Sequence, residues 1–488
     1  MKKLATLLLA AGMVFGAATG ASAIDFKAKG QWVMEFSAGD NNNFSEDGYG
    51  NAGKDNFDAR QRVRLQLDAV ASEALSGTVY FEIGDQIWGN AKTGGSLGAD
   101  GTNVVEVKNA YIDWIVPNTD LKLRMGIQGI KLPNFANGNS QILDDDAAGI
   151  VASYKFNENV AITALWARLY NDNGLASPST TTDGVKAGHY YAANEADNAD
   201  LFAVVLPLTF DGVKVTPWLA YATIGANAYN VSSPSAMGPG WSTFAAGTES
   251  HIQGKNNGDL NDYFDFVAAG LTGEITMADP FRFAWDFEYA SLNTGDSRKN
   301  KQGWYGTILG EYKMDWGTPG LYAWYASGED GDSSNGSEQL PSFNPNGTDQ
   351  YSTFASNGNP YLAANEGRLG KSWQGTWGIG ARIKDISFLE GLKHAVRINY
   401  IMGTNDKDGV RTRNNYDGGN SFINNMSTDE SALEIGLTNN YKIYENLDFY
   451  TDIAYLALWQ DEDMRKSNGH TNSVADAWNV TAAFVYSF

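Results

Sequence analysis

The most regular feature of the chain is an alternation of apolar and polar residues with a period of two. In the stretch FRFAWDFEYA, an aromatic residue stands at nearly every second position from Phe281 to Tyr289, and Arg282, Asp286 and Glu288 stand between them. Successive side chains of a β-strand point to opposite faces, so this pattern predicts strands with one apolar and one polar face. Helical periodicity is not sustained in any part of the chain.

Eighteen segments show this alternation, and the connections between them are long and short in turn. The short connections are turns such as DG and EN, whereas the long ones are rich in Asn, Asp, Ser and Gly. Nine long and eight short connections place both chain ends on the side of the short turns. The segments lie at residues 25–36, 57–70, 75–84, 104–115, 121–128, 147–156, 160–170, 198–209, 213–224, 262–275, 281–291, 301–315, 319–328, 371–384, 391–403, 429–443, 446–459 and 476–488.

Alternation alone fits either a soluble β-sandwich or a membrane barrel, which differ in the direction that the apolar face takes. Here the apolar faces end in aromatic residues, as the edges of a lipid-facing band do, and the polar faces carry charges. A chain built only of hairpins would also leave many strand edges exposed unless the sheet closed into a barrel. We therefore expect an all-β fold, a closed antiparallel transmembrane β-barrel. It would have 18 strands, with 16 as the alternative, short periplasmic turns, long extracellular loops and a single domain over 24–488.

The first 23 residues have the features of a secretory signal peptide. Lys2 and Lys3 precede an apolar run from Leu4 to Gly16, and Ala21-Ser22-Ala23 form a cleavage site. The chain has no cysteine, which excludes disulfides, thiolate metal sites and a lipid-bearing cysteine. Its net charge of −22 argues against a nucleic-acid partner.

The last predicted strand ends in an aromatic residue, Phe488, with Phe484 and Tyr486 on the same face. This ending resembles the C-terminal strand of Gram-negative trimeric porins, and the layout of residues 24–488 is similar to that family throughout. Within it, the chain most resembles the homotrimeric porins of sulfate-reducing proteobacteria. The resemblance implies an outer-membrane homotrimer in contact with lipid and lipopolysaccharide, whose last strand is the assembly signal read by the barrel-assembly machinery.

The sharpest cluster of charges is in FDARQRVRLQLDA, where Arg60, Arg62 and Arg64 share one strand face. An arginine facing lipid at the bilayer midplane costs about 2–4 kcal/mol, so we predict that the three line the lumen as a basic ladder. Lys122 and Arg124 in LKLRMGIQ extend this basic wall. The alternative is an exposed basic strand face, or a set of partners for acids in the loops.

The third long connection, residues 129–146, follows directly after the second basic strand. The porin resemblance implies that this loop folds into the barrel and narrows it, although the chain lacks the family's Pro-Glu-Phe-Gly stretch there. Its candidate constriction acids would then face the basic ladder and create a transverse field that orders polar solutes. The alternative is a solvated run before the next strand. These acids are Asp144, Asp145 and Asp146.

Further charged residues fall on predicted inward faces, and both signs are present. A mixed lumen favours a broad channel over a site for one ligand, and a sugar-specific channel would also line its lumen with aromatic rings, most of which fall on the outward faces here. The inward candidates are Arg282, Arg382, Lys384, Arg397, Asp286, Glu288, Glu311, Glu434, Asp448 and Asp452.

Two acidic loop stretches, GEDGDSSNGSE and NDKDG, have oxygen ligands at spacings that could hold Ca²⁺ weakly. The candidate ligands are Asp330, Asp332, Asp406 and Asp408, and the alternative is a pair of solvated surface loops. No other cofactor is indicated. The four histidines fit no catalytic motif, and we predict no enzymatic activity.

Together these features predict an outer-membrane porin, a water-filled channel for passive diffusion of small hydrophilic solutes and ions. One alternative is a substrate-selective channel for an organic acid or a sugar. The other is a plugged barrel that serves as an adhesin or a structural protein at the cell surface.

Overall fold

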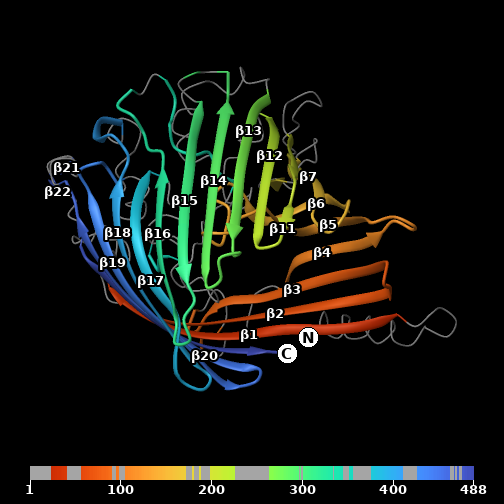
Figure 1. Ribbon diagram of the computed structural model, residues 1–488, viewed down its shortest axis with the longest axis horizontal. Coiled ribbons are helices and arrows are strands. Elements are labelled where there is room, and N and C mark those ends of the chain that lie inside the picture. The colour runs from red at the N-terminus through yellow and green to blue at the C-terminus, as the bar shows by residue number, and fades with distance from the viewer. Residues whose placement is uncertain are drawn as a thin grey trace.

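The computed structural model is a closed antiparallel β-barrel whose opposite walls cross at a steep angle in projection (Figure 1). Strands β12–β15 run upright in this view, whereas β1–β4 lie across it. The structure describes residues 24–40, 56–90, 95–97, 105–171, 179–180, 186–187, 198–225, 263–295, 297, 300–332, 335–343, 351–354, 375–409, 426–461, 466–467, 470–471 and 475–488. The predicted signal peptide lies outside the described residues.

Eighteen wall strands make up the barrel, which confirms the larger of the two predicted numbers. One of the wall strands is divided into two parts, β10 and β11, because Pro207 between them has no N–H to donate to the neighbouring strand. The strands are β1 (Asp25–Asp40), β2 (Asn56–Ser72), β3 (Leu75–Ile87), β4 (Val105–Ile115), β5 (Leu121–Lys131), β6 (Asp144–Lys155), β7 (Ala161–Asn171), β10 (Asn198–Val205), β11 (Leu208–Phe210), β12 (Val213–Gly225), β13 (Tyr263–Ile275), β14 (Phe281–Asn293), β15 (Lys301–Tyr312), β16 (Thr318–Ala326), β17 (Thr376–Leu389), β18 (Leu392–Gly403), β19 (Ser431–Tyr444), β20 (Leu447–Trp459) and β23 (Ala477–Ser487).

Two small hairpins lie outside the barrel sheet. Strand β8 (Ser179–Thr180) pairs with β9 (Lys186–Ala187), and β21 (Lys466–Ser467) pairs with β22 (His470–Thr471). Among the described residues, no helix is both long enough and apolar enough to cross a membrane.

The barrel closes where the first strand pairs with the last. Phe488 continues this seam beyond β23, because its backbone exchanges two hydrogen bonds with Gly30 at 2.8 and 3.0 Å. The Phe488 ring lies directly over Gly30, and a Cβ at that glycine would be 2.6 Å from the ring. Glycine therefore gives the terminal aromatic side chain a place on the outer wall.

The eight short connections all lie at the end of the barrel that holds both chain ends, and each has two or five residues. The turn before β12 needs Gly212, whose φ is +67°, and the turn before β18 needs Gly391, whose φ is +77°. The nine long connections lie at the opposite end. This separation of long and short connections is as the sequence predicts.

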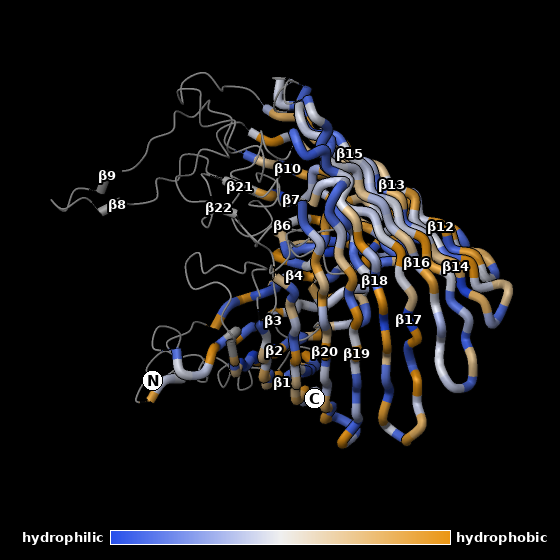
Figure 2. The backbone as a smooth tube through the Cα atoms, turned by 90° about the vertical axis from the view of Figure 1, so that its left-hand side faces the viewer, coloured by the Kyte–Doolittle hydropathy of each residue, from blue (hydrophilic) through white to orange (hydrophobic). Residues whose placement is uncertain are grey.

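The two faces of the wall differ as the alternation predicts, with apolar and polar residues following each other along the strands (Figure 2). Outward aromatic residues are exposed, and Trp32, Phe287 and Tyr486 are 47%, 46% and 42% exposed. Charged inward residues such as Glu35 and Asp286 are buried instead. A closed barrel places this exposed apolar band against lipid and the charged face around the lumen.

Candidate functional site: the lumen and its inner layer

The basic ladder lies on the inward face of β2, where neighbouring strands supply its counter-charges. Arg60 stands opposite the buried Glu35 of β1 and bonds Asp58 at 3.3 Å. Arg64 bonds Glu82 of β3, with 2.6 Å between Nε and Oε2. Arg62, between them, is 7% exposed. The acids that bond Arg60 and Arg64 thus belong to the barrel wall, on β2 itself and on β3.

A second basic group lies on β5, around a single acid of β4. Arg124 makes a two-pronged bond to Asp113, with both distances 2.8 Å, and Lys122 stands 3.5 Å from the same carboxylate. The Arg124 guanidinium also lies 4.1 Å from the centre of the Tyr111 ring. The side chains of Lys122 and Arg124 are 49% and 34% exposed. Two cations share one anion here, so this group leaves positive charge open to solvent.

The predicted placement of the three constriction acids in the third loop is wrong. Strand β6 begins at Asp144, so the three aspartates pair with the last three residues of β5. Asp146 bonds Lys108 and accepts a hydrogen bond from Asn109 at 2.8 Å. Polar residues can continue a strand as long as their backbone finds a partner, and the alternation rule stopped the predicted strand too early.

The third long connection does fold into the barrel, as expected, and residues 132–143 reach the far wall. Asp286 of β14 accepts backbone N–H groups from Phe135 and Ala136 at 2.7 Å each, and from Asn137 at 3.1 Å. Glu288 accepts the N–H of Gln141 at 2.9 Å. In the sheet, β7, β10, β12 and β13 separate β6 from β14. The loop therefore crosses part of the lumen and bridges strands that are five steps apart in the wall.

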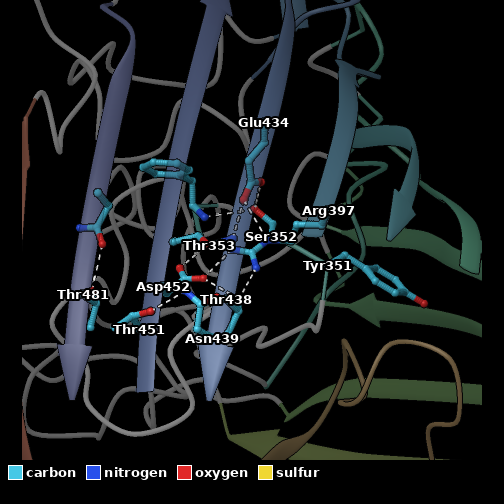
Figure 3. A network of polar contacts seen from close by, with 12 residues as sticks. Tyr351, Ser352, Thr353, Arg397, Glu434, Thr438, Asn439, Thr451, Asp452 and Thr481 are labelled. Carbon is cyan, nitrogen blue, oxygen red and sulfur yellow. Dashed lines mark hydrogen bonds and ion pairs between the residues drawn. The ribbon is translucent and has the colours of Figure 1, made fainter. Parts of the chain in front are cut away.

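A second loop enters the barrel between β16 and β17, and its residues 351–354 are anchored on β18–β20 (Figure 3). Glu434 accepts the N–H of Thr353 at 2.7 Å and also bonds the Ser352 hydroxyl. The Thr353 hydroxyl bonds Asp452 at 2.7 Å, and Arg397 pairs with Asp452 at 2.9 Å. One arginine faces two buried acids, and the hydroxyl and N–H groups of the loop supply the remaining donors.

The two loops also bond each other, and together they form what we call the inner layer: residues 132–143, 340–343 and 351–354. The Ser342 hydroxyl donates to the backbone carbonyl of Gln141 at 2.5 Å, and the N–H of Phe343 donates to the backbone carbonyl of Ile142 at 2.7 Å. Phe343 packs edge-on against Phe266 of β13, with 4.7 Å between ring centres. Apolar side chains of the inner layer form one buried cluster with inward residues of the wall, most of them on β7–β20.

Glu311 of β15 is the centre of a third charged group, close to the short-turn end of the barrel. It bonds Arg282 at 3.0 Å, Arg382 at 2.9 Å and Lys384 at 2.8 Å. Arg282 also bonds the carbonyl of Phe135 at 2.7 Å, which ties this group to the inner layer. Arg382 is buried, whereas the Lys384 side chain is 35% exposed.

A partly open pocket of about 280 Å³ lies beside the second basic group. Cationic and polar side chains, among them Lys122, Arg124 and Ser153, line one part of it. Apolar side chains, among them Leu132 and Val205, line the rest. The space thus offers cations and apolar surface side by side.

The two acidic stretches that could hold Ca²⁺ lie next to each other. The N–H of Asp406 donates to the carbonyl of Glu329 at 2.7 Å, and an added Cβ at Gly331 would be 3.3 Å from a carboxylate oxygen of Asp406. Within the described part of the chain, no three or more acidic, histidine or cysteine side chains are grouped to hold a metal ion. Calcium binding by Asp330, Asp332, Asp406 and Asp408 stays a prediction.

Several residues of the inner layer and its anchors carry no signal in the strand pattern. Tyr351, Ser352 and Thr353 stand in a loop without alternation. Inward aromatic residues are more numerous than expected, since Trp218, Tyr322 and Trp324 are buried at 2–3% exposure. The inner layer covers them, so they form a core and not an aromatic lining.

Neither the family models nor the curated proteins include a match to this chain. Solved structures of outer-membrane porins from Pseudomonas aeruginosa do match over nearly the whole chain. OprD is 13% identical, with a TM-score of 0.50 and 95% of both chains covered. OpdO is 10% identical, with a TM-score of 0.51 and coverage of 95% of this chain and 97% of its own, and OccK11 (OpdR) is 12% identical, with a TM-score of 0.50 and coverage of 95% and 96%. This likeness establishes a shared barrel fold.

Proposed function

We propose that the chain is a channel of the Gram-negative outer membrane through which small hydrophilic solutes diffuse, and that it selects among them. The observation that carries this proposal is the inner layer, which crosses the lumen and is anchored on buried carboxylates of the far wall. A general porin is expected to have one inward loop, whereas here two inward loops bond each other and narrow the lumen further. The porin fold of OprD and OpdO supports the same location and the same class of activity.

We propose small organic anions as the preferred solutes. Lys122 and Arg124 on the inward face of β5 remain open to solvent, and both pair with the same acid, Asp113. The adjoining space pairs these cations with apolar residues, as a carboxylate on a small hydrocarbon body requires. Selectivity in such pores follows from the width of the pore and the charges that line it. A sugar is the less favoured solute, because the inward aromatic rings are covered.

We further propose that the chain works as a homotrimer surrounded by lipid and lipopolysaccharide, delivered by a cleaved signal peptide. In this proposal the outward side chains of Phe484, Tyr486 and Phe488 form the signal for the barrel-assembly machinery. The proposal assigns transport and no catalysis to the chain.

Recording from single channels of the purified protein in planar lipid bilayers tests the function. A selective channel gives small ohmic steps, grouped in threes if the trimer is correct, and one class of solute blocks the current at sub-millimolar concentration. Block by carboxylates but not by neutral sugars of equal size supports the proposed solute. Large steps without block by any solute would favour a general diffusion pore, and complete absence of current would leave the plugged surface barrel.

A further inference from the structure

The contact between the two loops of the inner layer includes one side chain that also holds the barrel wall. The Tyr351 hydroxyl donates to the carbonyl of Ala136 at 2.6 Å, which joins residues 351–354 to residues 132–143. Two further bonds between the described parts of these loops come from Ser342 and Phe343. Tyr351 is completely buried, so its bond to Ala136 forms away from competing water.

Tyr351 contacts three successive wall strands. Its ring stacks on Tyr322 of β16, with 3.9 Å between ring centres and 7° between planes. The Arg382 guanidinium of β17 lies 5.3 Å from the ring centre. The Tyr351 carbonyl accepts a hydrogen bond from Asn399 of β18 at 2.5 Å. In Figure 3 the ring points away from the Arg397–Asp452 network that holds its neighbours.

We propose that Tyr351 is a positioning residue that couples the two loops, so that residues 132–143 and 351–354 hold their places across the lumen as one unit. The loops have separate anchors, the first on Asp286 and the second on Glu434 and Asp452. Without a link between them, each loop would leave its anchor independently. Because Tyr351 bonds the other loop while its ring is fixed on the wall, release of either loop requires breaking the Tyr351 contacts.

The Tyr351→Phe variant removes one of the three bonds between the described parts of the two loops and keeps the stacked ring. A buried neutral hydrogen bond corresponds to about a fivefold change in an equilibrium. We therefore expect the fraction of time spent in larger-conductance substates to rise about fivefold. Tyr351→Ala, which also loses the stacking on Tyr322, should raise it further. This test rests on the proposed channel function.

Tyr322→Phe is the matched control, because the Tyr322 hydroxyl bonds Asn399, which holds the Tyr351 backbone, and among the described residues it makes no bond to residues 132–143. This variant loses one hydroxyl from the same stacked pair, and its substates should stay as in the wild type. Equal substate occupancy in Tyr351→Phe and the wild type would overturn the proposal. An equal rise in both variants would overturn it as well, since it would reflect general loosening of the stacked pair.

Hydrogen exchange of the folded protein in detergent separates this proposal from the channel function. If the wild type passes no current, the channel function fails, and exchange still reports on the link. In Tyr351→Phe the amides of residues 132–143 and 351–354 should exchange faster together, whereas the barrel strands keep their protection. Faster exchange confined to residues 351–354 would show that the two loops are not coupled. Retention of the heat-modifiable band on gels verifies that each variant is folded.

Discussion

Asp286 gives the most direct test of the inner layer, because one side chain holds three backbone groups of the loop. Its carboxylate accepts the N–H groups of Phe135, Ala136 and Asn137 at 2.7–3.1 Å, and none of its surface is exposed. The Asp286→Ala variant removes all three bonds and leaves the loop amides without their acceptor. Asp286→Asn keeps the shape and one oxygen but loses the charge.

The size of the effect follows from the number of bonds. Hydrogen bonds to a charged group contribute about 1.5–3 kcal/mol each, so three of them at the lower value amount to about 4.5 kcal/mol. A difference of 1.4 kcal/mol is a factor of ten, and Asp286→Ala should therefore favour the detached loop about a thousandfold. Asp286→Asn should lose about half of that free energy, because one acceptor remains, which corresponds to roughly a fortyfold shift.

Single-channel recording and hydrogen exchange measure this shift. Asp286→Ala should show a larger and noisier conductance, and the amides of residues 135–137 should lose their protection. Glu288→Gln is the control with a smaller expected effect, because Glu288 accepts one loop N–H at 2.9 Å and the amide oxygen can still accept it. If Asp286→Ala keeps both the wild-type conductance and the protection of these amides, the carboxylate does not anchor the loop.

Three further predictions concern the wall. Serine at all three positions of the basic ladder should shift the reversal potential toward cation preference, because Glu35 and Glu82 lose their counter-charges; an unchanged potential would place the ladder away from the constriction. Gly30→Val should slow barrel assembly and weaken the heat-resistant gel band, since its Cβ would be 2.6 Å from the Phe488 ring, and a wild-type band would contradict that role. Lys122→Gln should weaken carboxylate block about tenfold in bilayer titrations by removing one cation from the β5 group, and unchanged block would exclude this residue from the solute path.

The barrel could be predicted from the sequence because the environment of each wall strand determines the residue types at successive positions. Lipid on one side and charged residues on the other impose a period of two on every strand, and the unequal loop lengths fix which ends lie together. The predicted strand boundaries are wrong at places where polar residues continue a strand. Strand β6 begins at Asp144, and β17 extends to Leu389, because backbone pairing continues where the alternation has stopped.

The inner layer could not be predicted in the same way, because its contacts join residues far apart in the sequence. Asp286 and Glu288 were expected on the inward face, but their partners stand about 150 residues earlier in the chain. Tyr351 lies in a loop, and its partner Ala136 stands 215 residues away. Every residue except proline has a backbone N–H, so the sequence does not show which residues donate to Asp286 or Glu288. An acid that holds a loop therefore looks the same in the sequence as an acid that lines a pore.

The position of the inner layer also indicates where solutes pass. Most wall residues of the buried apolar cluster lie on β7–β20, as do the anchors Asp286, Glu434 and Asp452, and the inner layer packs against this side. The β2–β5 wall instead carries charges that remain in contact with solvent, of which the Lys122 side chain, at 49% exposure, is the most open in the β5 group. Because a hydrated solute would displace apolar contacts on the close-packed side, we propose that the path of solutes follows the basic wall. Charge substitutions on β2 and β5 should therefore alter selectivity, whereas substitutions of the anchors should alter the width of the pore.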